Sequence, residues 1–252
     1  MSSTISKPAY RLEELTWQEF KELVPKKIDT VILPVGTVEA HGVSPLGTDN
    51  IIPVTIAERI ATDLKAMVAP LVPYGITRTL LAYPGSLTVT SATFENYLTE
   101  VLDSLAEKGF KKIVIMNGHG GQIDESRRAA QKIHQARKVK MVVIHWWLLC
   151  SEVTKEVFGQ AGGHAGIDET ACVLAVNPTL VKKQKYNKKL AYTMQEGVQA
   201  IPAPGTILLY KEGEGYPEFD EKKAKLYIGK VCQKVKTVLQ DIFKKWEQVD
   251  FQ

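Results

Sequence analysis

The sequence has few cysteines, no long hydrophobic run and no recognisable export signal. Its 252 residues include three widely spaced cysteines, Cys150, Cys172 and Cys232, an odd number that does not suggest a disulfide framework. All three lie in apolar stretches, which favours buried thiols over nucleophiles and indicates a reducing compartment. No apolar stretch approaches the roughly 18 residues of a membrane span, and the first residues lack the apolar core of a signal peptide. We therefore expect a cytoplasmic protein with no membrane partner.

The chain also lacks a strong excess of charge. Thirty-two basic and 28 acidic residues give a net charge of +4, which is too small and too dispersed for a nucleic-acid footprint. The single basic run, over residues 182–189, has no interleaved arginine and is typical of a solvated loop. Nucleic acid is therefore excluded as an expected partner.

Apolar runs and amphipathic segments alternate along the chain. Continuous apolar runs predict buried strands at 30–35, 67–72, 113–116 and 141–145. A capping box at Thr16 predicts a short helix, and longer helices are predicted at 51–64, 94–105, 122–137 and about 221–249. Strands that alternate with helices predict an α/β fold with a mostly parallel sheet between helices. No linker-like segment divides the chain, so we expect a single domain over residues 1–252.

Three of the five histidines adjoin glycine, in the pairs His41-Gly42, His119-Gly120 and Gly163-His164. Glycine permits tight turns and close approach to a ligand, so we expect all three pairs in loops. The first two loops directly follow predicted strands. Because sites in open parallel sheets form beyond the carboxyl ends of the strands, these two loops should face one crevice.

Carboxylates accompany these histidines. Glu39 and His41 stand two residues apart, so an extended segment points both to one face, and Asp49 follows in the same loop. Glu169 begins an apolar helix shortly after the third histidine. Carboxylate oxygens and imidazoles together suit a divalent ion. Taken singly, Asp49 is also a plausible helix N-cap and His119 a plausible turn residue. Their concurrence in glycine-rich loops favours a metal site.

Other catalytic signatures are missing. The sequence contains no G-x-S-x-G elbow, H-E-x-x-H helix, phosphate-binding G-x-x-x-x-G-K-[ST] loop or dinucleotide G-x-G-x-x-G loop. The sequence therefore lacks the motifs that best identify serine hydrolases, zincins, nucleoside triphosphatases and NAD enzymes.

At the residues quoted above, the chain resembles the creatininase (creatinine amidohydrolase) family of metal-dependent hydrolases. The resemblance also includes several short motifs, namely Leu33-Pro34-Val35-Gly36, Tyr74-Gly75, Tyr83-Pro84-Gly85-Ser86, Asn117-Gly118-His119-Gly120-Gly121 and Pro204-Gly205. It implies a three-layer α/β/α sandwich, two divalent ions, usually zinc or manganese with iron possible in principle, and a homo-oligomer that is often a hexamer.

The resemblance also implies roles for individual residues. The metal ligands it implies are Glu39, His41, Asp49, His119 and Glu169. In creatininase itself a further glutamate ligand stands where this chain has Gly121, and Glu169 is expected to take over. His164 matches the histidine that transfers protons. Glu169 is expected to be a catalytic residue as well as a metal ligand. Gly120, Gly121 and Trp147 correspond to the substrate pocket, where Gly120 replaces a tyrosine.

The expected reaction is hydrolysis of a small amide such as creatinine by a hydroxide shared between two metal ions, with His164 passing a proton to the departing nitrogen. Two alternatives within the same fold are a deformylase and an enzyme that trims a modified peptide. An alternative of another class is a non-catalytic metal-binding homologue.

Overall fold

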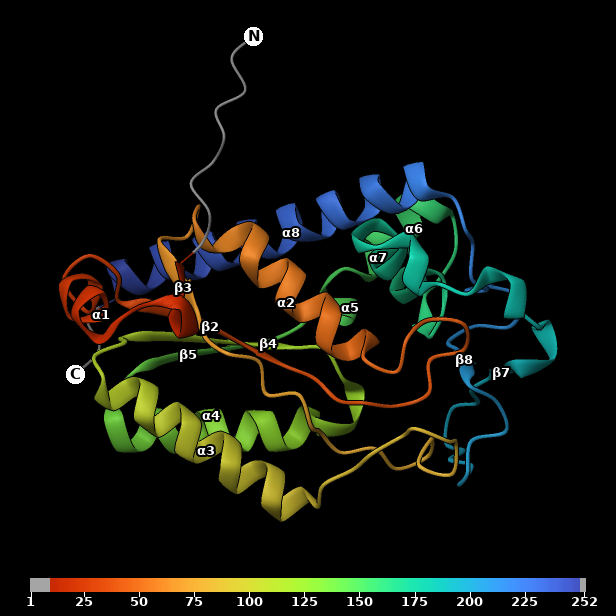
Figure 1. Ribbon diagram of the computed structural model, residues 1–252, viewed down its shortest axis with the longest axis horizontal. Coiled ribbons are helices and arrows are strands. Elements are labelled where there is room, and N and C mark those ends of the chain that lie inside the picture. Colours follow the sequence, from red (N-terminus) through yellow and green to blue (C-terminus); the bar gives the residue numbers. More distant parts are fainter. Residues whose placement is uncertain (1–9, 250–252) are drawn as a thin grey trace, which may run out of the picture.

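Five parallel strands form the central sheet of the computed structural model, which describes residues 10–249 (Figure 1). Their order across the sheet is β1, β3, β2, β4, β5, so the chain leaves β2 in one direction and returns to β4 on the other side. The strands are β1 Tyr10–Arg11, β3 Ala66–Val68, β2 Thr30–Val35, β4 Lys112–Asn117 and β5 Lys140–His145. The carboxyl ends of β2 and β4 lie side by side, where such sheets place their sites.

Helices cover both faces of this sheet (Figure 1). One face carries α1 Trp17–Leu23, α3 Ser91–Glu107 and α4 Ile123–Arg137. The other carries α2 Thr48–Ala61, α5 Trp146–Leu149, α6 Ser151–Phe158, α7 Ile167–Val176 and α8 Glu221–Gln248. Along β2, Ile32 packs into one core while Val31 and Leu33 pack into the other. The predicted three-layer α/β/α fold with a mostly parallel sheet is confirmed.

One predicted strand is too long. β3 ends at Val68, whereas the apolar run predicted a strand as far as Val72. Pro70 lies inside that run, and a proline has no N–H group to continue the hydrogen-bond ladder. Val72 keeps only an isolated bridge to Val35.

A second, smaller sheet lies at the end of the molecule beside the carboxyl edge of the main sheet (Figure 1). It consists of β6 Gly163–His164, β8 Ile207–Leu209 and β7 Ala191–Thr193. Strands of two or three residues are too short to show a sequence period, so this sheet was not predicted. His164 therefore lies on a short strand, not in the loop that its neighbouring glycine suggested.

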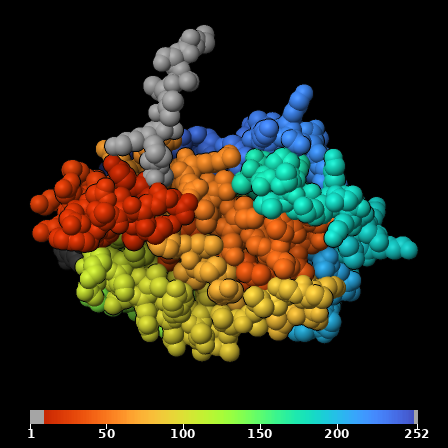
Figure 2. Space-filling view, in the orientation of Figure 1, coloured from red at the N-terminus to blue at the C-terminus, as the bar shows by residue number. Residues whose placement is uncertain are grey.

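Short 3-10 turns complete the fold, at Leu12–Glu14, Gly120–Gln122, Pro178–Leu180, Lys183–Lys185 and Lys188–Leu190. The basic run 182–189 forms two of these turns and is largely exposed, as predicted. Figure 2 shows this part of the chain, in cyan, protruding from one end of the molecule. Among residues 10–249, no helix is both long enough and apolar enough to cross a bilayer.

Candidate metal centre

The segment from the end of β2 to the first turn of α2 supplies three buried ionisable side chains. Glu39 and His41 follow β2, and Asp49 lies in the first turn of α2; each is 1–2% exposed. The N-cap of α2 is Gly47, so the interpretation of Asp49 as a capping residue is wrong and its carboxylate is free for another role. The Ala40 N–H donates to Ser86 Oγ at 2.9 Å, which fixes the backbone between Glu39 and His41.

The segment after β4 brings His119 to the same place. Asn117 brackets this histidine, since its Nδ2 donates to the His119 carbonyl at 2.8 Å and its Oδ1 accepts the His119 N–H at 3.2 Å. Gln122 Nε2 donates to Asn117 Oδ1 and to the Gly36 carbonyl, so one buried amide ties the two loops together. A side chain at Gly118 would meet the Asp49 carbonyl at 2.1 Å, so only glycine lets β4 approach α2 this closely.

The small sheet and α7 supply His164 and Glu169. Glu169 lies in the first turn of α7, where the helix dipole favours a carboxylate, and its Oε2 accepts the Ala165 N–H at 2.6 Å. The neighbouring Asp168 is buried and accepts the Gly163 N–H at 3.0 Å, which holds the backbone just before His164.

These side chains form three groups, two of which share Asp49. Those two are Glu39, Asp49 and His119, and His41, Asp49 and Glu169; the third is Glu39, His41 and His164. Within each group the candidate ligand atoms lie within 4.8 Å of one another. Asp49 Oδ1 is 2.9 Å from His41 Nε2, and Asp49 Oδ2 is 2.9 Å from His119 Nδ1. Each oxygen of one carboxylate therefore faces a different group.

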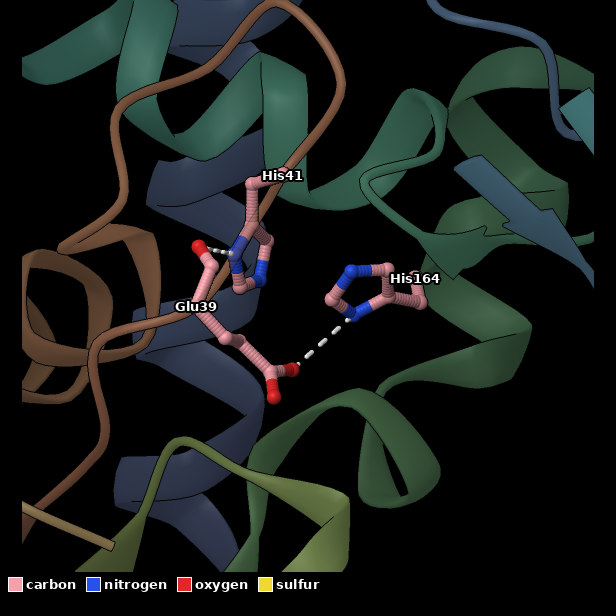
Figure 3. A group of neighbouring side chains, drawn as sticks. All are labelled: Glu39, His41 and His164. Carbon is pink, nitrogen blue, oxygen red and sulfur yellow. Dashed lines mark hydrogen bonds and ion pairs between the residues drawn. The ribbon is translucent and has the colours of Figure 1, made fainter. Parts of the chain in front are cut away.

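In each of three imidazoles, one ring nitrogen lies beside a backbone carbonyl. His41 Nδ1 lies 3.0 Å from the Glu39 carbonyl, His119 Nε2 lies 2.8 Å from the Ile76 carbonyl, and His164 Nε2 lies 2.9 Å from the Ala40 carbonyl. A nitrogen beside a carbonyl carries a proton, so the other nitrogen of each ring is the one directed at the carboxylates and is the atom that would bind a metal ion once its own proton is lost. Figure 3 shows His164 directed toward the Glu39 carboxylate, with Nδ1 to Oε1 at 3.6 Å.

The pKa shifts in this cluster indicate buried carboxylates with too little positive charge around them. Burial alone would lower the pKa of His41 and His119, but the neighbouring carboxylates, Asp49 and Glu39 foremost, outweigh it and raise these pKa values to about 10 and about 9. Burial raises the pKa of Glu39 and, more strongly, that of Glu169. Burial and the neighbouring His41 lower the pKa of His164 to about 3.

The donor set fits divalent metal ions. His41 Nε2 and Asp49 Oδ2 are buried, yet neither has a hydrogen-bond partner of acceptable geometry. Leaving such atoms unsatisfied is costly, and a cation held by each of the two groups that share Asp49 would satisfy them. Oxygen and imidazole donors of this kind accept zinc, manganese and iron.

A cavity of about 350 Å³ opens onto the cluster. Its wall includes the three residues predicted to contact substrate, Gly120, Gly121 and Trp147. A side chain at Gly121 would meet the Ile76 carbonyl at 2.2 Å and His119 Nε2 at 2.4 Å, so this backbone has no room for a glutamate there. Glu169 supplies the carboxylate of the second group instead.

Sequence reasoning missed several residues that shape this site. Gln122 and Asp168 position the loops, and Arg78 and Tyr210 line the cavity. Asp168 directly precedes Glu169 in the sequence, which was a usable signal. Arg78 lies in a segment with no period or motif, so nothing local indicated that it reaches this cavity.

Comparison with known proteins identifies the family. The Creatininase family profile, described as creatinine amidohydrolase, matches residues 13–229. The chain belongs to the creatininase family.

Its relatives within this family differ in what they act on. Creatinine amidohydrolase of Pseudomonas putida is 28% identical over 67% of this chain and 72% of its own length. A mycofactocin precursor peptide peptidase of Mycolicibacterium smegmatis is 31% identical over 65% of this chain, and 3-dehydro-scyllo-inosose hydrolase of Thermotoga maritima is 28% identical over 68%. The matches span only 62% and 58% of those two proteins.

Solved structures of creatininase have the same fold. One superposes with a TM-score of 0.79 at 22% identity, covering 93% of this chain and 98% of the other. The solved creatininases of this fold include a Zn–Zn form and a manganese form. The protein is thus a hydrolase-family chain with a candidate metal centre at the expected edge of its sheet.

Proposed function

We propose that the protein is an amidohydrolase that uses two divalent ions, zinc or manganese, to cleave a C–N bond of a small amide. The observation that carries this proposal is the division of Asp49 between two ligand groups. Glu39 and His119 complete one group, and His41 and Glu169 complete the other. A carboxylate that offers one oxygen to each of two groups suits a pair of ions that are close together.

Divalent ions held by these residues would lower the pKa of a bound water and polarise the substrate carbonyl. They would thereby supply a nucleophile without serine or cysteine. The chain's own residues do the rest. Asp49 fixes the separation of the two groups, and the carbonyls of Glu39 and Ile76 hold His41 and His119 with the ligand nitrogen inward. Trp147 and Gly120 form the wall against which the amide is placed.

We assign proton transfer to His164. Its Nε2 is held by the Ala40 carbonyl, so Nδ1 is the ring nitrogen left to relay a proton from the attacking water to the departing nitrogen. The low pKa of this imidazole favours passing that proton on over retaining it. The side chain lines the cavity and is 15% exposed, which gives it access to a substrate. Glu169 accepts the N–H of Ala165, the residue directly after His164, and so holds the backbone beside His164 in place.

The test combines metal analysis with substrate assays. Protein purified without added metal is expected to contain close to two ions per chain by elemental mass spectrometry, and Glu39→Gln is expected to lose one of them together with most turnover. Exposed Glu156, which contacts Lys230, provides the control Glu156→Gln. A Glu39→Gln protein with its full ion content and wild-type turnover would contradict the ligand assignment.

Creatinine ring opening, formate release from N-formyl compounds and cleavage of short peptides separate the substrate classes. We propose a small amide as the substrate, with creatinine as one example. The peptide reaction is the second candidate, because the relative with the highest identity of the three compared is a peptide peptidase. Tight binding of two ions without turnover of any amide would instead favour a non-catalytic metal-binding protein. The homo-oligomer stays a prediction, which sedimentation analysis tests.

A further inference from the structure

The cavity beside the metal centre has one permanently charged cation in its wall. Among the described residues that line it, Arg78 is the only lysine or arginine. The same wall contains Glu39, Asp49 and Glu169 of the centre. Nothing in the proposed hydrolysis uses an arginine at this position, so its presence in the cavity needs a separate explanation.

The structure holds Arg78 in place but does not bury it. Its Nη1 donates to the Gly121 carbonyl at 2.6 Å, and its Nη2 lies 3.4 Å from Glu125 Oε1. These contacts use two of its N–H groups, while 48% of its side chain stays exposed. A guanidinium that is anchored on one side and open on the other keeps donors in the fork geometry that fits a carboxylate or a phosphate.

The ion-pair network around Arg78 does not cancel its charge. Glu125 is shared with Arg128, which also contacts Glu95, and Glu95 in turn contacts Lys132. The network therefore joins three cations, Arg78, Arg128 and Lys132, to two carboxylates. One positive charge is left over, and of the three cations only Arg78 lines the cavity.

We propose that Arg78 binds an anionic group of the substrate, a carboxylate or a phosphate, while the scissile amide lies at the metal centre. This inference rests on the proposed amidohydrolase function and narrows its substrate class to amides that carry an acidic group. Two divalent ions would outweigh the three carboxylates of the centre, so an anionic substrate is not repelled there. Creatinine carries no such group and would make no use of Arg78.

Matched pairs of hydroxamates test the proposal without requiring turnover. Alkyl hydroxamates bind metal ions, and ω-carboxy and ω-phosphono hydroxamates of the same chain length add only the anionic group. Calorimetric affinities are measured for the zinc-loaded protein over chains of two to four methylene groups. In the wild type, one of the anionic series is expected to bind about 10- to 100-fold more tightly than its neutral partner, the range expected for a charged hydrogen-bonded pair. Which series gains identifies carboxylate or phosphate.

The decisive quantity is the ratio of the anionic to the neutral affinity in each variant. Arg78→Gln is expected to reduce this ratio to near one, and Arg78→Lys to restore part of it. Arg127→Gln changes an exposed arginine that pairs with Asp124 and does not line this cavity, so it should keep the wild-type ratio. No anionic preference in the wild type, or a preference that survives Arg78→Gln, would overturn the role of Arg78. If no hydroxamate binds, not even a neutral one, the proposed metal centre is overturned and this inference with it.

Discussion

Two regions of this molecule bury ionisable groups with opposite consequences. The carboxyl edge of the sheet buries carboxylates and imidazoles that contact one another, and the core beneath α8 buries three thiols among apolar side chains. In the first region, mutual attraction outweighs burial at Asp49, His41 and His119 and maintains their charge, whereas burial prevails at Glu39, Glu169 and His164. In the second, burial is the largest influence on each thiol and keeps the thiols neutral. Burial by itself therefore does not mark a functional site; complementary partners do.

The largest effect is expected at Asp49, because both ligand groups depend on it. Asp49→Asn removes the charge that faces His41 and His119, so we expect loss of both ions and a fall in kcat/KM of about a thousandfold or more. Elemental analysis and steady-state kinetics measure the two effects. Asp63→Asn, at an exposed carboxylate paired with Lys236, serves as the control. Retention of two ions in Asp49→Asn would show that Asp49 does not join the groups.

A smaller and more selective loss is expected at Glu169. Glu169→Gln keeps an oxygen for the Ala165 N–H, so the start of α7 is preserved while the charge near His41 is lost. We expect one ion to remain, held by Glu39, Asp49 and His119, with activity reduced about a hundredfold. Metal titration gives the stoichiometry. Loss of both ions, or of neither, would show that the two groups are not separate.

Much of the fold could be predicted from the sequence because its strands are continuous apolar runs with both faces covered. The strands at 30–35 and 141–145 and the long final helix agree with the structure to within a few residues. The boundary of β3 was missed because Pro70 ends a run that hydrophobicity alone would extend. The small sheet was missed because strands as short as Gly163–His164 carry no pattern.

The candidate ligands Glu39, His41, Asp49 and His119 could be found from the sequence because they lie in glycine-rich loops that follow predicted strands, whereas Glu169 became a candidate ligand through the family resemblance. Their division into two groups could not, since it depends on which oxygen of Asp49 faces which ring. Arg78 could not be found either. Its approach to Gly121 depends on a contact between residues 43 positions apart, which no local period encodes.

The smallest effect is expected for the three buried cysteines, which we predict will not react with an alkylating reagent in the native protein. Burial raises the pKa of Cys150 to about 12 and that of Cys232 to about 11, and it raises that of Cys172 well above 9. With these pKa values the thiols should be almost wholly protonated at pH 8. Because the thiolate is the nucleophile, we expect them to be inert. Iodoacetamide is expected to label none of the three in the native protein within an hour, and all three in denaturant, as counted by mass spectrometry. Rapid native labelling of Cys150 would mean that this core opens readily. In that case the contrast between the two regions would reflect access to solvent more than the partners that each group has.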